Sequence, residues 1–219
     1  TDGAGTVIGS GFTGIFNGQG HVVSDLFIDR PAADYVGLFG QVSNATISGV
    51  GIVGGAVTGH DFVGRLLGSQ IGGETALTYS TATVDGRNLV GGLAGYERYG
   101  SLSQSYATGA VSGSGTVGGL VGHMRGGSLA QVYATGATTG TGYNVGGLVG
   151  DMHGGSITEA YAAGAVSGNT YVGGLVGYIQ YDDYTSTWAT ISQAYATGAV
   201  TGANYVGGLI GLVYYDFLG

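Results

Sequence analysis

The hexapeptide Val117-Gly118-Gly119-Leu120-Val121-Gly122 decides how this chain folds, because it returns at a regular interval along the sequence. Identical copies occupy residues 145–150 and 172–177, and variant or shortened copies occupy 36–40, 63–68, 90–95 and 206–211. The leucines of these copies lie at positions 38, 66, 93, 120, 148, 175 and 209, so the successive spacings are 28, 27, 27, 28, 27 and 34. The sequence therefore contains a repeat of about 27 residues that extends over residues 35–219.

A second motif keeps the same spacing as the hexapeptide. The segment Ser105–Val111 (Ser-Tyr-Ala-Thr-Gly-Ala-Val) has relatives around Tyr133, Tyr161 and Tyr195. Within each repeat, polarity alternates over runs of a few residues, and Gly, Ser, Thr and Asn separate these runs. Since glycine in a helix interior costs about 0.5–1 kcal/mol, this pattern excludes helical repeats. We predict an all-β protein, a β-solenoid with three short strands per coil and about seven coils.

Stacking of coils explains the choice of residues, because each residue of a solenoid lies above its equivalent in the previous coil. An aliphatic ladder is expected from Leu93, Leu120, Leu148, Leu175 and Leu209, and an aromatic ladder from Tyr79, Tyr106, Tyr133, Tyr161 and Tyr195. Glycine is expected at turns that require positive φ and where the core is narrow. Like charges would repel each other in such ladders, which accounts for a charged fraction of 8%.

The composition excludes several classes of protein and of partner. The chain has 50 glycines among 219 residues but one proline, so it is not collagen, and 43% hydrophobic residues argue against disorder. It has no cysteine, and a formal net charge of −8 disfavours nucleic acid as a partner. The longest apolar run, Tyr205–Tyr215, is shorter than the roughly 20 residues of a membrane-spanning helix, so no membrane span is predicted. Residues Thr1–Gly11 lack the features of a secretory signal, which predicts a mature product or an excised segment.

Catalytic motifs are rare in the sequence. G-x-G-x-x-G occurs at 49–54 and 113–118, but a chain so rich in glycine produces such matches by chance, and neither opens a helix. G-x-S-x-G is absent, lysine is absent, and the 13 carboxylates are mostly dispersed. None of the 4 histidines is followed by glutamate, so the H-E-x-x-H signature of zinc peptidases is missing. We therefore predict a protein that is not an enzyme and that has no cofactor, with bound calcium as the alternative left open.

Together, the Gly-Gly-Leu-Val-Gly motif of residues 118–122 and the Ser-Tyr-Ala-Thr-Gly segment of 105–109 resemble the GLUG-motif repeats of bacterial surface proteins. The opening stretch Phe12–Ile28 is similar to the coil that often leads into such arrays, so we expect a lead-in coil at 1–34 and one continuous repeat domain at 35–219. Such repeats occur in large secreted filamentous-haemagglutinin-like adhesins and in the non-catalytic parts of immunoglobulin-A-cleaving metallopeptidases. The resemblance implies a right-handed β-helix outside a bacterial cell, in an adhesive or structural role.

The spacing of 34 residues marks the main departure from the repeat, a longer segment at Tyr178–Trp188 that contains the only tryptophan. The repeat alignment places Tyr215 over Tyr181 and Asp216 over Asp182, so two coils would present one aromatic and acidic patch. The candidate ligand-binding residues are Tyr181, Asp182, Asp183, Tyr184, Trp188, Tyr215 and Asp216. Such a patch suits stacking on sugars, or calcium held by Asp182, Asp183 and Asp216. The alternative is a tolerated insertion whose rings fold back on the rod.

The segments after the hexapeptides form a second departure. The alignment gives three columns: Tyr96, His123 and Asp151; Glu97, Met124 and Met152; and Arg98, Arg125 and His153. We expect a solvated corner with one methionine ladder. The alternatives are a ligand or metal site formed by His123, Asp151 and His153, and a binding edge for a partner. A third departure, the threonines at 108, 135 and 197, suits ice binding on a flat array, or ordinary strand preference.

Two functions fit these expectations. The first is a secreted bacterial surface module that acts as a rigid β-helical rod in cell adhesion and binds a receptor or glycan on a host or neighbouring cell. The second is a structural subunit of a self-assembling extracellular fibre or stalk, in which uncapped strand edges associate end to end. The hexapeptide repeats up to residue 211 without a polar cap, so the chain is expected to continue or to polymerise. An ice-binding or polysaccharide-active β-helix is a weaker alternative, and the expected location is extracellular, at the bacterial cell surface.

Overall fold

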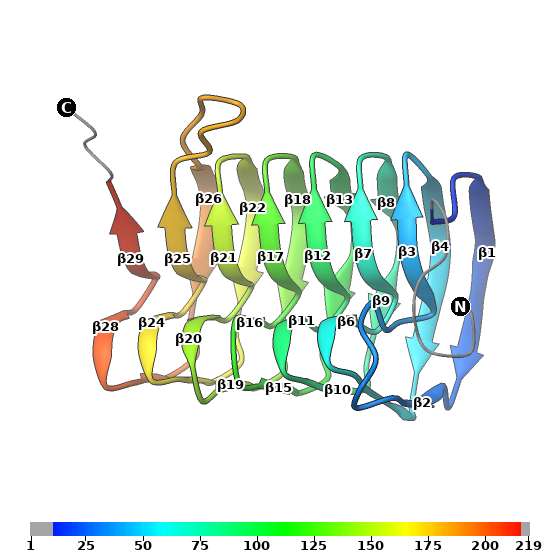
Figure 1. Ribbon diagram of the computed structural model, residues 1–219, viewed down its shortest axis with the longest axis horizontal. Helices are drawn as coiled ribbons and strands as arrows, with labels where there is room; N and C mark the ends of the chain where they lie inside the picture. Colours follow the sequence, from blue (N-terminus) through cyan, green and yellow to red (C-terminus); the bar gives the residue numbers. More distant parts are fainter. Residues whose placement is uncertain (1–10, 216–219) are drawn as a thin grey trace.

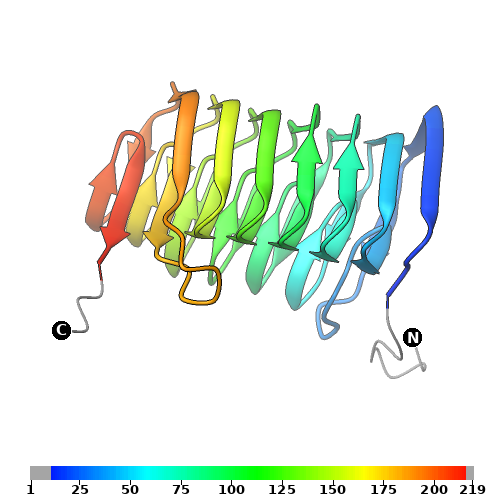
Figure 2. The same cartoon turned by 90° about the horizontal axis from the view of Figure 1, so that it is seen from above.

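The computed structural model describes residues 11–215 and shows an all-β solenoid of stacked parallel coils (Figure 1). In Figure 1 the chain rises along the front sheet, crosses at the top, descends along the rear sheet and advances from right to left, so the coil is right-handed. Figure 2 shows the same rod from above, with the coils side by side along its length. The front sheet has seven strands, so six complete turns separate its first strand from its last.

Each coil contributes strands to four sheets, which we name by their features. The hexad sheet, which is the front sheet of Figure 1, contains β3 (Phe39–Ser43), β7 (Leu67–Ile71), β12 (Ala94–Arg98), β17 (Val121–Arg125), β21 (Val149–His153), β25 (Val176–Gln180) and β29 (Ile210–Tyr214). The tyrosine sheet contains β1 (Ile15–Ser24), β4 (Thr46–Val53), β8 (Glu74–Ala76), β9 (Tyr79–Ser80), β13 (Ser101–Ser103), β14 (Tyr106–Ala107), β18 (Ser128–Ala134), β22 (Ser156–Ala162) and β26 (Thr190–Ala196). The base sheet contains β2 (Phe27–Asp29), β5 (Ala56–Thr58), β10 (Thr83–Gly86), β15 (Val111–Gly113), β19 (Thr138–Gly140), β23 (Val166–Ser167) and β27 (Val200–Thr201). The corner sheet contains β6 (Asp61–Gly64), β11 (Asn88–Gly91), β16 (Val117–Gly118), β20 (Tyr143–Gly146), β24 (Thr170–Gly173) and β28 (Asn204–Gly207).

The number of strands per coil differs from the sequence expectation. Three strands per coil were predicted, and this number is wrong, because the coils run through four sheets. The strands of the base and corner sheets are two to four residues long, as in β15 and β16. Runs this short do not show an alternation with a period of two, so the sequence does not reveal the corner that separates them.

Neighbouring coils are in register, so equivalent residues of the repeat face each other. Tyr96 pairs with His123, and His123 pairs with Asp151, which confirms the columns derived from the repeat. The expectation of a solvated corner is wrong, because these residues belong to strands β12, β17 and β21 of the hexad sheet. Side chains alternate between the two faces of a strand, so the middle column points into the core. Its members Glu97, Met124 and Met152 are 0–1% exposed.

The interior contains two hydrophobic clusters. The larger lies between the hexad and tyrosine sheets and includes the fully buried Leu93, Leu120, Leu148 and Leu175. Leu209, in the last described coil, is 40% exposed. The smaller cluster consists of valines from the base and corner sheets, chiefly Val57, Val63, Val84, Val90, Val111, Val117, Val145, Val166 and Val172. Full burial of one leucine side chain stabilises the fold by about 1.5–3 kcal/mol, so the aliphatic ladder is a main source of stability.

Close packing between coils is the main role of the glycines. Among residues 11–215, positive φ occurs at sixteen non-glycine residues and at ten glycines. At Gly118 a Cβ would overlap the carbonyl oxygen of Val121 and would lie 2.7 Å from the amide nitrogen of Gly150 in the next coil. Of the two roles expected for glycine, close approach of backbones therefore predominates over positive φ.

The described part of the first 34 residues stacks on the repeats. Strand β1 pairs in parallel with β4, with a register shift between Asn17 and His21, and β2 pairs in parallel with β5. The division into a lead-in coil at 1–34 and repeats at 35–219 stays a prediction. Within residues 11–215 there is no helix long and apolar enough to cross a membrane.

Candidate binding surface

Residues 181–189, the insertion loop, connect β25 to β26 and account for the longest spacing of the repeat (Figure 1, top). Asp182 and Thr187 form an antiparallel bridge, in which Asp182 N donates to Thr187 O at 3.0 Å and Thr187 N donates to Asp182 O at 3.3 Å. The loop lies against Gly154, where a Cβ would be 2.9 Å from Thr187 Oγ1 and 3.0 Å from Asp182 Cβ. The glycine at 154 therefore leaves room for the loop to fold back over the preceding coil.

The Asp182 side chain fastens the insertion loop to an earlier coil. It is 1% exposed, and its Oδ1 accepts hydrogen bonds from Arg125 Nε at 3.2 Å and Nη2 at 3.1 Å. Within the loop, Thr185 Oγ1 donates to Oδ2 at 2.9 Å and Tyr184 N donates to Oδ1 at 3.1 Å. Burial by itself raises the pKa of Asp182, but the hydrogen bonds from Thr185, Tyr184 and Arg125 outweigh it and lower the pKa below its usual value. The carboxylate is thus ionised and engaged by the protein itself.

Three candidate ligand-binding residues, Tyr181, Trp188 and Tyr215, form what we call the rim aromatic cluster. The ring centroids of Tyr181 and Trp188 are 5.1 Å apart, and those of Trp188 and Tyr215 are 4.7 Å apart. Trp188 is 41% exposed and Tyr215 is 60% exposed. A pocket of about 340 Å³ opens beside them, with Ile191 and Val213 among its apolar walls. The structure therefore brings the aromatic members of the predicted patch together.

Of the other candidate residues, Tyr184 contacts Arg125 and is not part of the rim aromatic cluster. Tyr184 is 73% exposed, and the Arg125 guanidinium lies 5.9 Å from its ring centroid. Asp183 is exposed, and Asp216 lies outside the described residues. Calcium held by Asp182, Asp183 and Asp216 stays a prediction, and it would require Asp182 to give up its bonds to Arg125 and to the loop.

The tyrosine sheet carries a continuous stack of aromatic rings. Consecutive ring centroids are 4.6–5.3 Å apart and the ring planes lie within 9° of each other, through Tyr79, Tyr106, Tyr133, Tyr161 and Tyr195. Burial, together with the neighbouring phenols of Tyr106 and Tyr161, raises the pKa of Tyr133. Each stacked pair contributes about 0.5–1.5 kcal/mol, so this column supports the fold. The threonines at 108, 135 and 197 follow these strands, in the connections to the base sheet.

The outer face of the hexad sheet bears a groove of about 360 Å³ that sequence reasoning missed. Tyr35, Phe62 and Tyr96 line it, together with His123 and His153. The rings of Tyr35 and Phe62 stack with centroids 4.5 Å apart, and both residues have positive φ. Bulky residues seldom adopt positive φ, so their residue types do not predict it. The sequence therefore does not indicate that the rings of Tyr35 and Phe62 line this groove.

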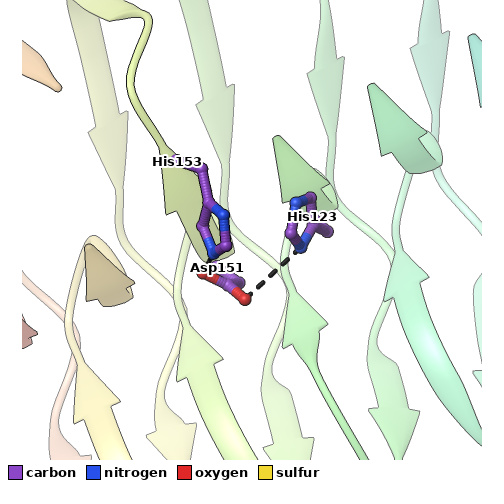
Figure 3. Close-up of side chains that lie close together, drawn as sticks. All are labelled: His123, Asp151 and His153. Carbon is purple, nitrogen blue, oxygen red and sulfur yellow. Dashed lines mark ion pairs between the residues drawn. The ribbon is translucent and has the colours of Figure 1, made fainter. Parts of the chain in front are cut away.

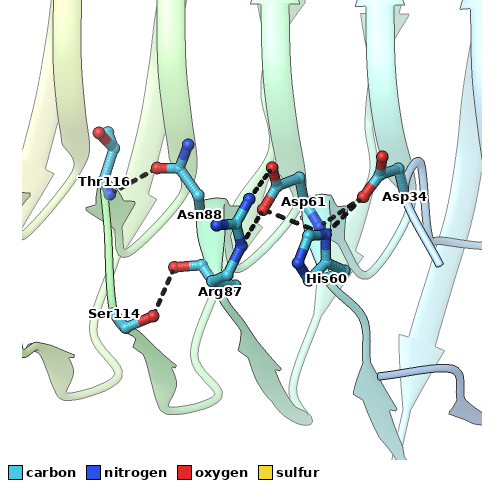
Figure 4. Close-up of polar contacts among 7 residues, drawn as sticks. All are labelled: Asp34, His60, Asp61, Arg87, Asn88, Ser114 and Thr116. Carbon is cyan, nitrogen blue, oxygen red and sulfur yellow. Dashed lines mark hydrogen bonds and ion pairs between the residues drawn. The ribbon is translucent and has the colours of Figure 1, made fainter. Parts of the chain in front are cut away.

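A chain of polar contacts follows the corner sheet across several coils (Figure 4). His60 Nδ1 lies 2.9 Å from Asp34 Oδ1. Arg87 donates to both carboxylate oxygens of Asp61, from Nε at 3.0 Å and from Nη2 at 2.7 Å. These groups are partnered by one another, so we interpret the chain as a surface network that connects coils. The Arg87 side chain is largely exposed, so water and salt screen its ion pair and the effect of the network on stability is modest.

Comparisons with known proteins support a GLUG-type repeat and a β-helical fold. The family model of the GLUG motif matches residues 168–201. Halomucin of Haloquadratum walsbyi is 42% identical over 62 residues, which are 28% of this chain and 1% of the length of halomucin. Among solved structures, a protein of Bacteroides ovatus provisionally named as an immunoglobulin A1 protease superimposes with a TM-score of 0.62 at 18% identity, covering 89% of this chain and 68% of that one. At this identity the structural likeness shows the fold alone.

Proposed function

We propose that this chain is a rigid, non-catalytic β-helical segment of a secreted or cell-surface protein that mediates adhesion to another cell. The GLUG motif and the similarity to halomucin support a surface repeat protein. The hexad sheet runs without interruption from β3 to β29, and each inner coil is hydrogen-bonded to both of its neighbours. Such a rod holds a binding surface at a fixed distance and orientation from the rest of a surface protein.

The rim aromatic cluster is the observation that carries the adhesive role. Its exposed rings lie beside an apolar pocket, and aromatic rings of this kind stack on the apolar faces of sugars. The bonds between Asp182 and Arg125 hold the insertion loop in place before any ligand arrives. Such pre-organisation lowers the entropy cost of binding. We infer that the ligand is a glycan on a host or neighbouring cell.

Binding of the purified chain to a glycan array and to intact cells tests this proposal. Trp188→Ala is expected to weaken binding by about tenfold or more, as expected for an aromatic residue that contributes over 1.4 kcal/mol. Tyr143→Ala is a matched control, because Tyr143 is 63% exposed and lies on the corner sheet. Unchanged binding by Trp188→Ala, or an equal loss in both variants, would show that the rim aromatic cluster is not the binding site.

A subunit of an extracellular fibre is the second candidate function. Strands β1 and β29 lie at the two ends of the described rod, and each pairs with one other described strand. Val206 and Leu209 in the last described coil are 45% and 40% exposed. Open strand edges and apolar coil ends favour pairing with another chain or with a further coil of the same protein. Electron microscopy separates the candidates, since long uniform filaments indicate the fibre and isolated short rods indicate the adhesin segment.

A further inference from the structure

Two successive coils bring three metal-ligating side chains together on the outer face of the hexad sheet (Figure 3). His123 lies on β17, and Asp151 and His153 lie on β21, with His123 and Asp151 paired across the strands. Residues two apart in a strand share one face, so Asp151 and His153 both project from the outer face, beside His123. One ligand atom from each residue lies within 4.8 Å of the others.

The distances within this group fit coordination of a single ion. His123 Nδ1 lies 3.3 Å from Asp151 Oδ2, and His153 Nε2 lies 3.1 Å from Asp151 Oδ1. Nitrogen and oxygen ligands at about 2.0–2.2 Å from a tetrahedral ion are about 3.3 Å from one another. A cation between the two rings and the carboxylate would therefore replace direct contacts by metal–ligand bonds with little movement of the strands.

The Asp151 carboxylate is buried and is held toward the two histidines. Asp151 is 8% exposed, and its Oδ1 has no hydrogen bond of good geometry within the described part of the chain, although His153 Nε2 is near it. Asn144 Nδ2 donates to Oδ2 at 3.2 Å and so orients the carboxylate. Outer contacts of this kind typically support carboxylates that bind metals. A cation at this point would replace the poorly aligned contact between His153 Nε2 and Asp151 Oδ1 by metal–ligand bonds.

Access also favours a cation here. The side chains of His123 and His153 are 14% and 23% exposed toward the groove, which gives an ion a path to the site. Arg125, the nearest cation in the column of His153, is paired with Asp182 at 3.1 Å.

We propose that His123, Asp151 and His153 form a binding site for a divalent transition-metal ion of the zinc class, bridging β17 and β21. Two imidazoles and one carboxylate suit Zn²⁺ and its neighbours in the first row, whereas Ca²⁺ prefers a shell of oxygen ligands. The ion joins two coils across the strand register, so it stabilises the folded rod by mass action. Three protein ligands leave a further coordination position, which faces the groove and takes water or a carboxylate or imidazole of a partner.

Calorimetric titration of the chelator-stripped chain with zinc chloride tests the site. One equivalent of Zn²⁺ is expected to bind, and Asp151→Asn and His153→Gln are each expected to weaken binding by more than about 100-fold. Co²⁺ in place of Zn²⁺ is expected to give the strong visible bands of a low-coordinate ion in the parent chain and not in His153→Gln. His153 lies toward the surface, so this variant decides the test if Asp151→Asn fails to fold, as judged by circular dichroism without metal.

His60→Gln is the matched control, because Asp34, His60 and Asp61 form the other His and Asp group of this kind among residues 11–215. Arg87 occupies both carboxylate oxygens of Asp61, so this variant is expected to bind zinc as the parent does. The proposal is overturned if the parent chain shows no heat of binding up to about 1 mM zinc. It is equally overturned if His60→Gln loses binding while His153→Gln keeps it.

Discussion

Replacing Glu97 by glutamine is expected to stabilise the chain at neutral pH, because Glu97 carries a carboxyl group into the core. Its side chain is 1% exposed and lies next to the fully buried Met124 of the following coil. Its Oε1 accepts a hydrogen bond from Gly100 N at 2.5 Å, whereas Oε2 has no hydrogen-bond partner within the described residues. Burial raises the pKa of Glu97 well above its ordinary value, and the hydrogen bond from Gly100 offsets part of this rise.

The direction of this shift determines how stability changes with pH. The folded state holds the Glu97 proton more tightly than the unfolded chain, so this contribution to stability is fully present below the unfolded pKa of about 4.3. It is lost as the pH rises through the folded pKa. Between these two pKa values, the free energy of unfolding of the parent falls relative to Glu97→Gln by about 1.4 kcal/mol per pH unit. Glutamine keeps an acceptor for Gly100 N and carries no charge, so the variant escapes this loss.

Denaturation in urea, followed by far-ultraviolet circular dichroism between about pH 4 and pH 8, measures the effect. Glu74→Gln is the control, because Glu74 is an exposed carboxyl group on β8. The control is expected to follow the parent at every pH, while Glu97→Gln gains relative stability as the pH rises. Parallel curves for the parent and Glu97→Gln across this range would refute the reasoning, as would a lower stability of Glu97→Gln at neutral pH.

Three further tests, two of them with a control substitution, concern how the insertion loop and the coils are held in place. Asp182→Ala removes the contact with Arg125 that holds the insertion loop. Chymotrypsin should therefore cut the loop sooner, while circular dichroism shows that the coils stay folded. An unchanged rate of cutting would show that this contact does not hold the loop. Leu120→Ala is expected to lower the free energy of unfolding, measured in urea, by about 2–5 kcal/mol. Leu209→Ala, at a position that is 40% exposed, is expected to lower it by much less. Equal losses would show that burial in the leucine ladder does not set the stability of the rod. Gly118→Ala is expected to abolish or strongly weaken folding because its Cβ would overlap backbone atoms, whereas Gly208→Ala, with nothing within 4 Å, should keep the parent melting temperature. Equal melting temperatures for the two glycine variants would contradict this account of close packing.

Much of the fold could be predicted because a solenoid converts a period in sequence into a column in space. The alignment of hexapeptides places His123 between Tyr96 and Asp151, and the strand register of the folded chain is the same. The number of strands per coil was not predictable in this way. Strands as short as β16, with two residues, carry no measurable alternation, so their corners are set by packing between coils.

The candidate site was less predictable, because it depends on contacts between distant residues. Asp182 resembled a free ligand in the sequence, yet it pairs with Arg125, which lies 57 residues earlier in the chain. Two members of the rim aromatic cluster could be predicted to lie together, because Tyr181 and Tyr215 follow residues that pair in neighbouring coils. The place of Trp188 between them depends on how the insertion loop folds back, which the repeat does not specify.

By itself the sequence determined the coil: its length, its columns, its leucine and tyrosine positions and the need for glycine between stacked backbones. Only the tertiary structure decided which side of each column faces the core. A shift of one residue in where a strand begins exchanges its two faces, and short strands between glycines leave that choice to packing. For this reason Glu97, the second residue after its hexapeptide, lies in the core, while His123 and Asp151, each the first residue after its own copy, meet on the outer face of the hexad sheet.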